Sequence, residues 1–483
     1  MRDHLVFYIN GTRHTLSDDA VLGSVTDLLR NRLGLVGTKV VCNEGDCGAC
    51  SVLVGRPSDD GKCLYYQTLD SCIAFPFQLD RTHIVTIEGL LTEGNLSPVQ
   101  AAMVRCHGSQ CGFCTPGFVV ALHGIIESDA GLSDESLRYE LSGNLCRCTG
   151  YVSILDAGRS VELDKVKRLK ERYSESTMLD DFKALGEEPV QLSTRYGFVF
   201  LPRTIEQAME FRDAYPNATI VSGATDYGVL RNHGKIQAND TLCLSLVRDF
   251  SEIHVHENIL SIGGGATWRA IEDFVKSMIP EYHAILTRFG SPQIRNAGTL
   301  AGNLACGSPI ADSIPFHWIM QTEIELRSVR GVRRVNLESF YQGYRKTILA
   351  KDELIVAIHT PVPKPNEHIQ LYKISKRRDM DISTVTLGLW LSMDGNCIQD
   401  ARLAVGGVGP TVLRLANAEN ILIGNLVSEN LFREAGLAAR QAISPWSDVR
   451  GGAEYRFQLV ENLLLKCYYE LFQPSENTTS LVS

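Results

Sequence analysis

The chain has 483 residues, 44% of them hydrophobic and 21% charged, so it is an ordinary globular protein that exceeds the size of a single domain. Its formal net charge of -9 argues against a broad nucleic-acid-binding surface, because phosphate binding needs clustered lysine and arginine. The sequence shows no secretory signal and no run of about 18 apolar residues, so we expect no membrane span and a cytoplasmic location.

The fourteen cysteines are unevenly distributed, and ten of them lie between Cys42 and Cys148. Cytosolic thiols are kept reduced, so this concentration predicts metal binding rather than disulfide bonds. The remaining cysteines are scattered singly, and we expect them to be small buried hydrophobic residues: Cys243, Cys306, Cys397 and Cys467.

The first 85 residues predict a small mixed sheet packed on one helix. Asn10-Gly11 suits a tight turn between two strands in residues 5–16. A helix is expected from a Ser24 N-cap to Gly34. Further strands are expected at residues 51–54, 63–68 and 83–90.

Residues 86–160 predict a helical domain. Ser97 and Gln100 form a capping-box pattern around Pro98, and Thr115 with Pro116 repeats the helix-start signal before an apolar face. Residues 134–158 add further helical segments.

The rest of the chain predicts a linker and two more domains. Residues 161–190 are rich in charge and are expected to cross the surface as a partly helical linker. Strands and helices then alternate in an α+β domain at residues 191–366, and strands followed by helices predict a further α+β domain at residues 367–475.

The first cysteine set has the plant-type ferredoxin spacing, in which four thiolates hold a [2Fe–2S] cluster. Gly45 and Gly48 suit a loop that folds tightly around such a cluster and turns its N–H groups toward sulfur. Cys63 is an alternative fourth ligand, and zinc is disfavoured because structural zinc sites use two short ligand pairs. The expected ligands are Cys42, Cys47, Cys50 and Cys72.

The second set consists of two separated pairs, in "QCGFCTPG" (residues 110–117) and "NLCRCTGY" (residues 144–151). Two such pairs suit zinc, and thiolates near the start of a helix also suit an anionic cluster. The residues alone leave both interpretations open for Cys111, Cys114, Cys146 and Cys148.

Taken together, the three motifs "CNEGDCGACSVLVG", "QCGFCTPG" and "NLCRCTGY" closely resemble the iron–sulfur half of the molybdenum hydroxylases, the family of xanthine dehydrogenase and aldehyde oxidase. The resemblance implies one [2Fe–2S] cluster in a β-grasp ferredoxin domain at residues 1–85 and a second in a four-helix domain at residues 86–160. It also implies that Gln110 lies close to the molybdopterin cofactor and that Cys148 borders the same electron route.

Two loops of small residues follow in the third domain. Residues 222–226 come after a strand, and residues 288–312 form a second such stretch. Loops of this kind can bring backbone N–H groups to a phosphate, although paired turns explain them equally well and no G-x-G-x-x-G fingerprint is present. Both stretches resemble the FAD-binding loops of the same family, whose domain has the vanillyl-alcohol oxidase fold.

The resemblance implies specific flavin contacts. Phe289 would pack on the isoalloxazine ring, Asp312 would bind the nucleotide part, and the Ile355 backbone and Lys373 would add contacts, although residue type alone makes Lys373 a solvated charge. The residues implied to hold the pyrophosphate and ribityl chain are Thr219, Ile220, Val221, Ser222, Gly223, Ala224, Thr225, Asp226, Thr299, Leu300, Ala301, Gly302 and Asn303.

"FYQGYRKT" (residues 340–347) resembles the segment whose tyrosine helps to bind NAD in the dehydrogenases of the family. That tyrosine is Tyr344 here, which by residue type alone would be a half-buried strand residue. Tyr341 stands where the family usually has phenylalanine.

The resemblance implies the small subunit of a two-chain bacterial enzyme. Molybdopterin would lie on a large partner subunit, in a heterodimer or a dimer of heterodimers, where hypoxanthine or xanthine would be oxidised to urate. Electrons would then pass through the two clusters to FAD and on to NAD. Another molybdenum hydroxylase acting on an aldehyde or N-heterocycle is the alternative, and a non-enzymatic, zinc-stabilised interaction protein is a second one.

Overall fold

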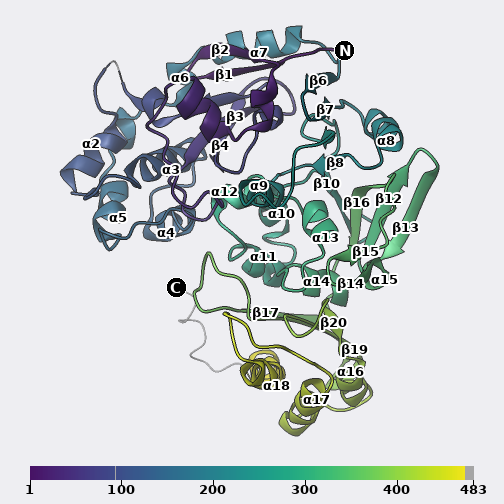
Figure 1. The fold of residues 1–483 in the computed structure, drawn as a ribbon. Coiled ribbons are helices and arrows are strands. Elements are labelled where there is room, and N and C mark those ends of the chain that lie inside the picture. Colours follow the sequence, from purple (N-terminus) through teal and green to yellow (C-terminus); the bar gives the residue numbers. More distant parts are fainter. Residues whose placement is uncertain (93, 474–483) are drawn as a thin grey trace. The chain divides into compact units, whose positions relative to one another are not determined.

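The computed structural model describes residues 1–92 and 94–473 (Figure 1). The chain divides into two compact units. The first unit comprises Met1–Phe250, Thr267–Arg269 and Gly290–Thr299, and the second comprises Ser251–Ala266, Ala270–Phe289 and Leu300–Ser483. Within the described residues no helix is both long and apolar enough to cross a membrane.

The N-terminal part of the first unit is a five-stranded mixed sheet with strand order β2-β1-β5-β3-β4, in which β1 and β5 run parallel. Asn10 and Gly11 both have positive φ, so the predicted tight turn between β1 and β2 is confirmed. The strands are β1 (Leu5–Ile9), β2 (Thr12–Leu16), β3 (Ser51–Pro57), β4 (Leu64–Asp70) and β5 (His83–Val85).

The predicted helix over this sheet is present. Ser24 and Asp27 form a capping box at its start, and Gly34 follows its end with positive φ. The helix consists of α1 (Val25–Asp27) and a π-helical turn, η2 (Leu28–Arg32), and the short helices nearby are η1 (Asp19–Leu22), η3 (Pro76–Leu79) and η4 (Ile87–Leu90).

The helical domain also forms as expected, and the Ser97–Gln100 capping box is confirmed. The second helix start differs from the prediction. The helix begins at Thr115 itself, with Cys114 at the N-cap, and Thr115 Oγ1 instead donates to Ser109 Oγ. Pro116 tolerates this shift because the first helical positions need no N–H partner. The helices are α2 (Pro98–Arg105), α3 (Thr115–Glu127), α4 (Asp134–Glu140) and α5 (Val152–Arg159).

Residues 161–190 are partly helical, as predicted, but they are not confined to the surface. Leu169, Met178 and Phe182 are buried in the same core as α3. The charge density of the segment concealed this apolar face, which ties it to the helical domain. Its helices are η5 (Leu163–Lys165), α6 (Leu169–Arg172) and α7 (Glu175–Ala184).

A four-stranded sheet with order β6-β7-β9-β8 completes the first unit. Val190, Val221 and Cys243 of this sheet lie in one continuous core with Leu5 and Phe7 of β1. The elements are β6 (Val190–Thr194), β7 (Gly197–Leu201), β8 (Thr219–Val221), β9 (Thr241–Cys243), α8 (Ile205–Ala214), α9 (Tyr227–Asn232) and α12 (Pro292–Arg295).

The second unit contains a five-stranded antiparallel sheet with order β10-β11-β16-β12-β13. Its strands are β10 (Ile253–His256), β11 (Ile259–Gly263), β12 (Glu323–Ser328), β13 (Gly331–Asn336) and β16 (Leu354–Pro361), and a hairpin is formed by β14 (Tyr341–Gly343) and β15 (Lys346–Thr347). The associated helices are α10 (Trp268–Val275), α11 (Pro280–Leu286), α13 (Leu300–Cys306), α14 (Ile314–Ile319) and α15 (Leu337–Phe340).

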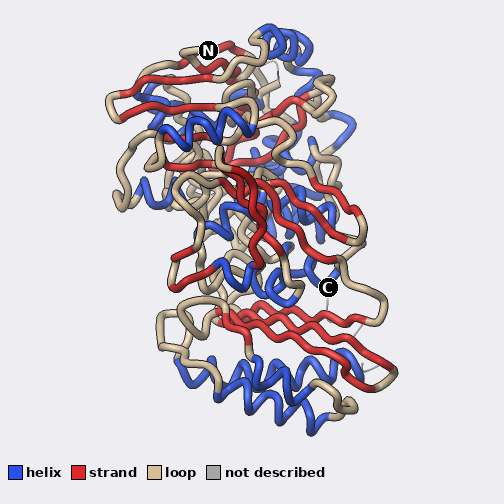
Figure 2. The backbone as a smooth tube through the Cα atoms, turned by 90° about the vertical axis from the view of Figure 1, so that its right-hand side faces the viewer, coloured by secondary structure: helices blue, strands red, loops and turns tan. Residues whose placement is uncertain are grey.

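The C-terminal part of the second unit is a four-stranded antiparallel sheet with helices on one face (Figure 2). Strands followed by helices were expected here, although residues 474 and 475 of the predicted domain lie outside the described residues. The elements are β17 (Glu367–Ile374), β18 (Val385–Asp394), β19 (Cys397–Gly406), β20 (Leu413–Arg414), α16 (Ala416–Leu422), α17 (Glu429–Gln441) and α18 (Ala453–Phe472).

The four isolated cysteines are only partly as predicted. Cys243 and Cys467 are completely buried, as small hydrophobic residues would be, whereas Cys306 and Cys397 are half-buried.

Stability of the second unit should depend on pH through His317. This side chain is fully buried among hydroxyl groups, and burial lowers its pKa to about 3. The unfolded chain binds a proton near the ordinary pKa of about 6.5, so acid favours unfolding. We expect a loss of about 2 kcal/mol from this residue between about pH 7 and pH 5. Urea unfolding at both pH values should show a smaller pH effect in His317→Gln than in the wild type.

Candidate functional site

The first cysteine set gathers at one place in the first unit. Cys50 and Cys72 are buried, with 2% and 1% of their surface exposed, and the Cys72 sulfur contacts those of Cys42 and Cys50. Cys42 also contacts Cys47. These sulfur–sulfur hydrogen bonds lower the pKa of Cys42 and raise the pKa of Cys47 and of Cys72. A cluster of thiols that favours deprotonation of one member has the chemistry of a soft metal-binding site.

The loop that carries this set has the backbone expected for a tight sulfur-binding turn. Asn43, Gly45 and Gly48 all have positive φ. The N–H groups of Glu44 and Asp46 each lie 3.4 Å from the Cys42 sulfur. Donated N–H groups stabilise a thiolate or a cluster sulfur, so the loop fits a [2Fe–2S] group.

Cys63 is separated from this group. It is exposed in the turn between β3 and β4, where its backbone N–H donates to Ser58 Oγ. Of the two candidates for a fourth ligand, Cys72 is therefore the one that contacts the other sulfurs.

The second cysteine set is also brought together. Cys114 contacts Cys146, and Cys111 contacts Cys148. Burial is the largest single influence on the pKa of Cys146 and raises it, but the hydrogen bonds from Thr149 Oγ1 (3.1 Å), from the Thr149 and Cys148 backbone and from Cys114 together outweigh burial, so the net shift is downward. Among the described residues, these two cysteine sets included, no three or more His, Cys, Asp or Glu side chains are arranged with the geometry of a metal-ion site.

The two cysteine loops touch through their backbones. The N–H of Leu145 donates to the carbonyl oxygen of Cys47 over 3.0 Å. A Cβ atom at Gly117, at the start of α3, would lie 2.2 Å from the Gly48 carbonyl oxygen, which only glycine permits. One hydrogen bond therefore links Cys47 of the first set to the residue preceding Cys146 of the second.

The first candidate flavin loop lies against residues 297–298. A Cβ atom at Gly223 would be 2.0 Å from the Ala297 carbonyl oxygen, and one at Gly298 would be 3.3 Å from the Thr225 hydroxyl. Ala224 has φ of 60°, a left-handed conformation that turns the loop sharply. The two glycine-bearing segments pack backbone against backbone in a narrow cradle, which fits the close approach of a phosphate-containing cofactor.

The same loop and the helix α9 that follows it are both hydrogen-bonded to the ferredoxin domain. Gln78 Nε2 donates to the carbonyl oxygen of Ser222 over 2.9 Å. At the end of α9, Asn232 Nδ2 donates to the carbonyl oxygens of Cys72 and Asn43, each over 2.9 Å. Sequence reasoning missed both amides, because a lone glutamine or asparagine carries no local signal of a partner more than a hundred residues away.

Asp312 and Lys373 form a buried ion pair within the second unit. Lys373 Nζ lies 2.6 Å from Asp312 Oδ2 and donates to the carbonyl oxygen of Arg288 over 2.9 Å. The Lys373 side chain is 2% exposed and that of Asp312 8%. The expectation of a solvated charge, based on residue type alone, is wrong for Lys373, because its charge is neutralised locally by Asp312.

The remaining flavin candidates are distributed over the second unit. Ile355 is buried in β16 beside a bulge, where the carbonyl oxygen of its neighbour Val356 accepts the N–H of Gly264. Phe289 is half-buried after α11. The chain from Leu300 to Asn303 forms the start of α13, while Thr299 itself belongs to the first unit.

Tyr344 lies in the β14–β15 hairpin and is 56% exposed, more than expected for a half-buried strand residue. Its neighbour Tyr341 is half-buried, and its hydroxyl donates to the carbonyl oxygen of Leu304 over 3.1 Å. The tyrosine in place of the family's phenylalanine therefore adds a hydrogen bond to α13.

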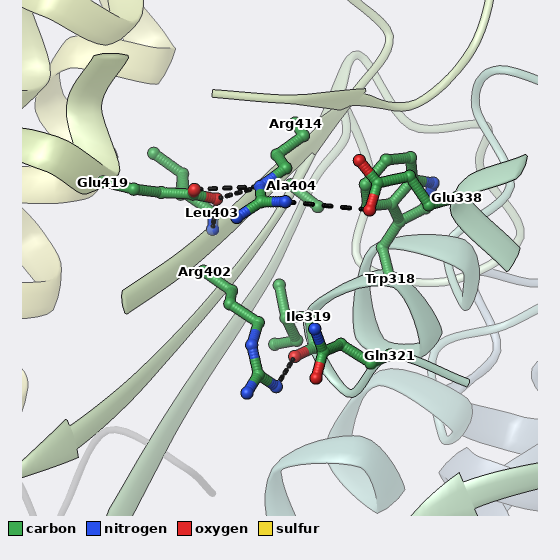
Figure 3. Close-up of a pocket in the computed structure, with 9 residues that line it drawn as sticks. All are labelled: Trp318, Ile319, Gln321, Glu338, Arg402, Leu403, Ala404, Arg414 and Glu419. Carbon is green, nitrogen blue, oxygen red and sulfur yellow. Dashed lines mark hydrogen bonds and ion pairs between the residues drawn. The ribbon is translucent and has the colours of Figure 1, made fainter. Parts of the chain in front are cut away.

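Two cavities lie in the second unit. The one in Figure 3 has a volume of about 10 Å³, enough for about one water molecule. Charged side chains in its wall are ion-paired with each other, as Arg414 is with Glu419. The other has a volume of about 340 Å³ and lies beside Lys373, with Arg288 and Lys466 also in its wall. Its size is in the range of small-molecule sites.

The glycine cradle predicts a sensitive substitution. Gly223→Ala places a methyl group against the Ala297 carbonyl oxygen, so the two segments must separate. We expect a cost of about 1–3 kcal/mol and FAD affinity about 5- to 150-fold weaker, measured by flavin retention and titration. The matched control is Gly23→Ala, whose added methyl group makes only ordinary contacts. Equal FAD affinity in both variants would contradict the assignment.

Four domain families match the chain in succession. They are described as a 2Fe-2S iron-sulfur cluster binding domain (residues 7–76), a [2Fe-2S] binding domain (residues 86–159), an FAD binding domain in molybdopterin dehydrogenase (residues 192–363) and a CO dehydrogenase flavoprotein C-terminal domain (residues 370–471). The predicted multidomain α+β organisation, with two [2Fe–2S] domains and an FAD-binding domain, is confirmed.

Curated relatives include xanthine dehydrogenases. The chain is 29% identical to xanthine dehydrogenase of Emericella nidulans, covering 99% of this chain and 39% of the relative. It is 28% identical to xanthine dehydrogenase/oxidase of Gallus gallus, covering 98% and 40%. The chain thus spans about two fifths of the length of these relatives.

Solved structures show a similar fold over part of the chain. Reconstituted CO dehydrogenase from Oligotropha carboxidovorans is 25% identical with a TM-score of 0.53, covering 56% of this chain and 94% of that one. Quinoline 2-oxidoreductase from Pseudomonas putida 86 is 24% identical with a TM-score of 0.53, covering 57% and 95%.

Proposed function

We propose that this chain, whose domains fit the iron–sulfur and FAD part of a molybdenum hydroxylase, is the electron-transfer subunit of a xanthine dehydrogenase. The observation that carries the proposal is the joining of the two cysteine loops within one compact unit, by the hydrogen bond from Leu145 to Cys47. In this proposal each cysteine set holds one [2Fe–2S] cluster, and electrons cross from the helical domain to the ferredoxin domain.

The clusters would supply one-electron transfer, and FAD would convert single electrons into hydride transfer to NAD. The protein's own residues would fix the geometry. Asn232 ties the end of α9 to the Cys72 carbonyl, and α9 directly follows the loop at residues 222–226. The flavin loop and a cluster ligand are therefore held by one short helix, which supports electron transfer between them.

The flavin contacts carried over from the family remain part of the proposal. The cradle at Gly223 supports binding of the FAD pyrophosphate, and within the second unit the larger cavity, with Arg288 in its wall, supports binding of an anionic group. The exposed ring of Tyr344 is available to a nicotinamide nucleotide such as NAD.

A large molybdopterin-containing subunit is the proposed partner. Cys111 and Cys148 of the second set are exposed, and so is Gln110. Exposed apolar side chains occur beside them, Phe113 at 49% and Val152 at 65%. Exposed ligands flanked by apolar groups suit a surface that receives electrons from another polypeptide.

The alternative function is the equivalent subunit of another molybdenum hydroxylase. The specific observation in its favour is the similarity to the CO dehydrogenase and quinoline 2-oxidoreductase structures. The substrate-binding residues would lie on the partner, so the substrate must be tested with both chains present.

The test is to co-express this chain with its molybdenum-binding partner and measure NAD reduction with hypoxanthine, xanthine, an aldehyde and quinoline. We expect NADH formation and urate with the two purines. NADH formation with the aldehyde or quinoline alone would refute the purine assignment. A colourless protein with stoichiometric zinc would refute the cluster and flavin assignments together.

A further inference from the structure

Two buried amide side chains, Asn144 and Gln293, lie between the cysteine loops and the segment that leads to the flavin cradle. They are 2% and 1% exposed. Asn144 Nδ2 donates to the Gly48 carbonyl oxygen over 3.0 Å, and Gln293 Nε2 donates to Asn144 Oδ1 over 2.9 Å. The second Gln293 donor reaches Ser51 Oγ over 3.1 Å. We call Asn144 and Gln293 the amide pair.

The amide pair joins three segments that are distant in sequence. Gly48 directly follows Cys47, Asn144 directly precedes Leu145, and Gln293 lies on α12. All three segments belong to the first unit. A Cβ atom at Gly143 would lie 2.1 Å from Gln293 Oε1, so the amide is packed directly onto the backbone of the second cysteine loop.

The hydrogen bonds of the amide pair flank the backbone contact between the loops. The Leu145 N–H donates to the Cys47 carbonyl oxygen. Beside this bond, the side chain of Asn144, which precedes Leu145, donates to the carbonyl oxygen of Gly48, which follows Cys47. The bond from Asn144 to Gly48 is buried, where an unpaired carbonyl is costly, so the two loops resist any shift that would break it. The register between the two loops therefore depends on the amide pair.

We propose that Asn144 and Gln293 are positioning residues for electron transfer between the two clusters, an inference that rests on the proposed function. They hold the Leu145–Cys47 hydrogen bond in place, and this bond completes a continuous path of bonds from Cys146 to Cys47. One electron leaves the reduced group of the helical domain and enters the oxidised group of the ferredoxin domain. No bond is formed or broken, so the rate depends on the separation and coupling that the amide pair fixes.

The test uses the full chain with both clusters bound, fully reduced so that each cluster carries an unpaired spin. The readout is the magnetic splitting between the two signals in low-temperature electron paramagnetic resonance. The variants are Asn144→Asp and Gln293→Met, which keep side-chain size but remove the donors. The control is Asn296→Ala, which breaks a buried bond from the same region to the Thr68 carbonyl oxygen, in a strand that belongs to neither cysteine loop.

We expect both variants to keep full iron content and both cluster signals, but to lose the splitting that the wild type and Asn296→Ala show. An unchanged splitting in both variants would overturn the proposal. Loss of a cluster from both variants would also overturn it, because the amide pair would then serve cluster retention rather than coupling. Absence of clusters from the wild type would instead refute the proposed function, which keeps the two failures distinguishable.

Discussion

Replacing Cys72 with serine should abolish the ferredoxin-domain cluster and reduce bound iron by about half, because each of the two [2Fe–2S] groups needs four thiolate ligands. Serine keeps the size of the side chain but its hydroxyl is a much weaker ligand for iron. Cys72 is 1% exposed and its sulfur contacts those of Cys42 and Cys50, so the substitution removes one thiol from within the gathered set. Iron analysis and visible absorbance measure the loss.

The control for this experiment is Cys63→Ser. Cys63 is the alternative fourth ligand that the sequence offers, and it is exposed in the β3–β4 turn. We expect this variant to retain all its iron. If Cys63→Ser lost the cluster and Cys72→Ser kept it, the ligand assignment would be wrong and the loop would have to rearrange on binding iron.

Replacing Lys373 with methionine should destabilise the second unit by about 3–5 kcal/mol, because the Asp312 carboxylate is left buried without its cation. Methionine fills the space of the lysine stem, so the effect reports the lost charge and the lost hydrogen bond to Arg288 rather than a cavity. The urea concentration at the midpoint of unfolding should decrease. FAD retention should fall with it if Lys373 also contacts the cofactor.

Two further variants isolate the ion pair. Lys376→Met removes a nearby but exposed lysine whose Nζ donates to the Val449 carbonyl oxygen, and it should change stability by no more than about 0.5 kcal/mol. The double variant Lys373→Met/Asp312→Asn removes both charges and should be more stable than Lys373→Met alone. A Lys373→Met variant as stable as Lys376→Met would show that the pair contributes nothing.

Local features were predictable from sequence. The Asn10-Gly11 turn and the Ser97 capping box depend on neighbouring residues alone, so the sequence contains the whole signal. The grouping of cysteines was also predictable, because motif spacing limits which thiols can share a cluster. The start of α3 was placed one residue late, since threonine before proline suits both the N-cap and the first helical position.

Long-range features were not predictable. Lys373 reads as a surface charge within a basic run, and its partner Asp312 lies sixty-one residues earlier in the chain. Asn232, Gln78 and the amide pair likewise acquire their roles only when distant backbone carbonyls arrive beside them. Residues 161–190 were misjudged for the same reason, because Phe182 is apolar surface that only the folded helical domain covers.

The continuous core between the ferredoxin sheet and the sheet of β6 to β9 determines whether the ferredoxin domain can fold apart from the rest of the chain. Leu5 and Phe7 share this core with Val190 and Val221, so a chain cut between the two sheets would expose apolar surface on both fragments. The ferredoxin domain, although recognisable from its sequence, is therefore not expected to be a portable module. Transplanting it into another redox protein would require redesign of the face that β6 to β9 now cover.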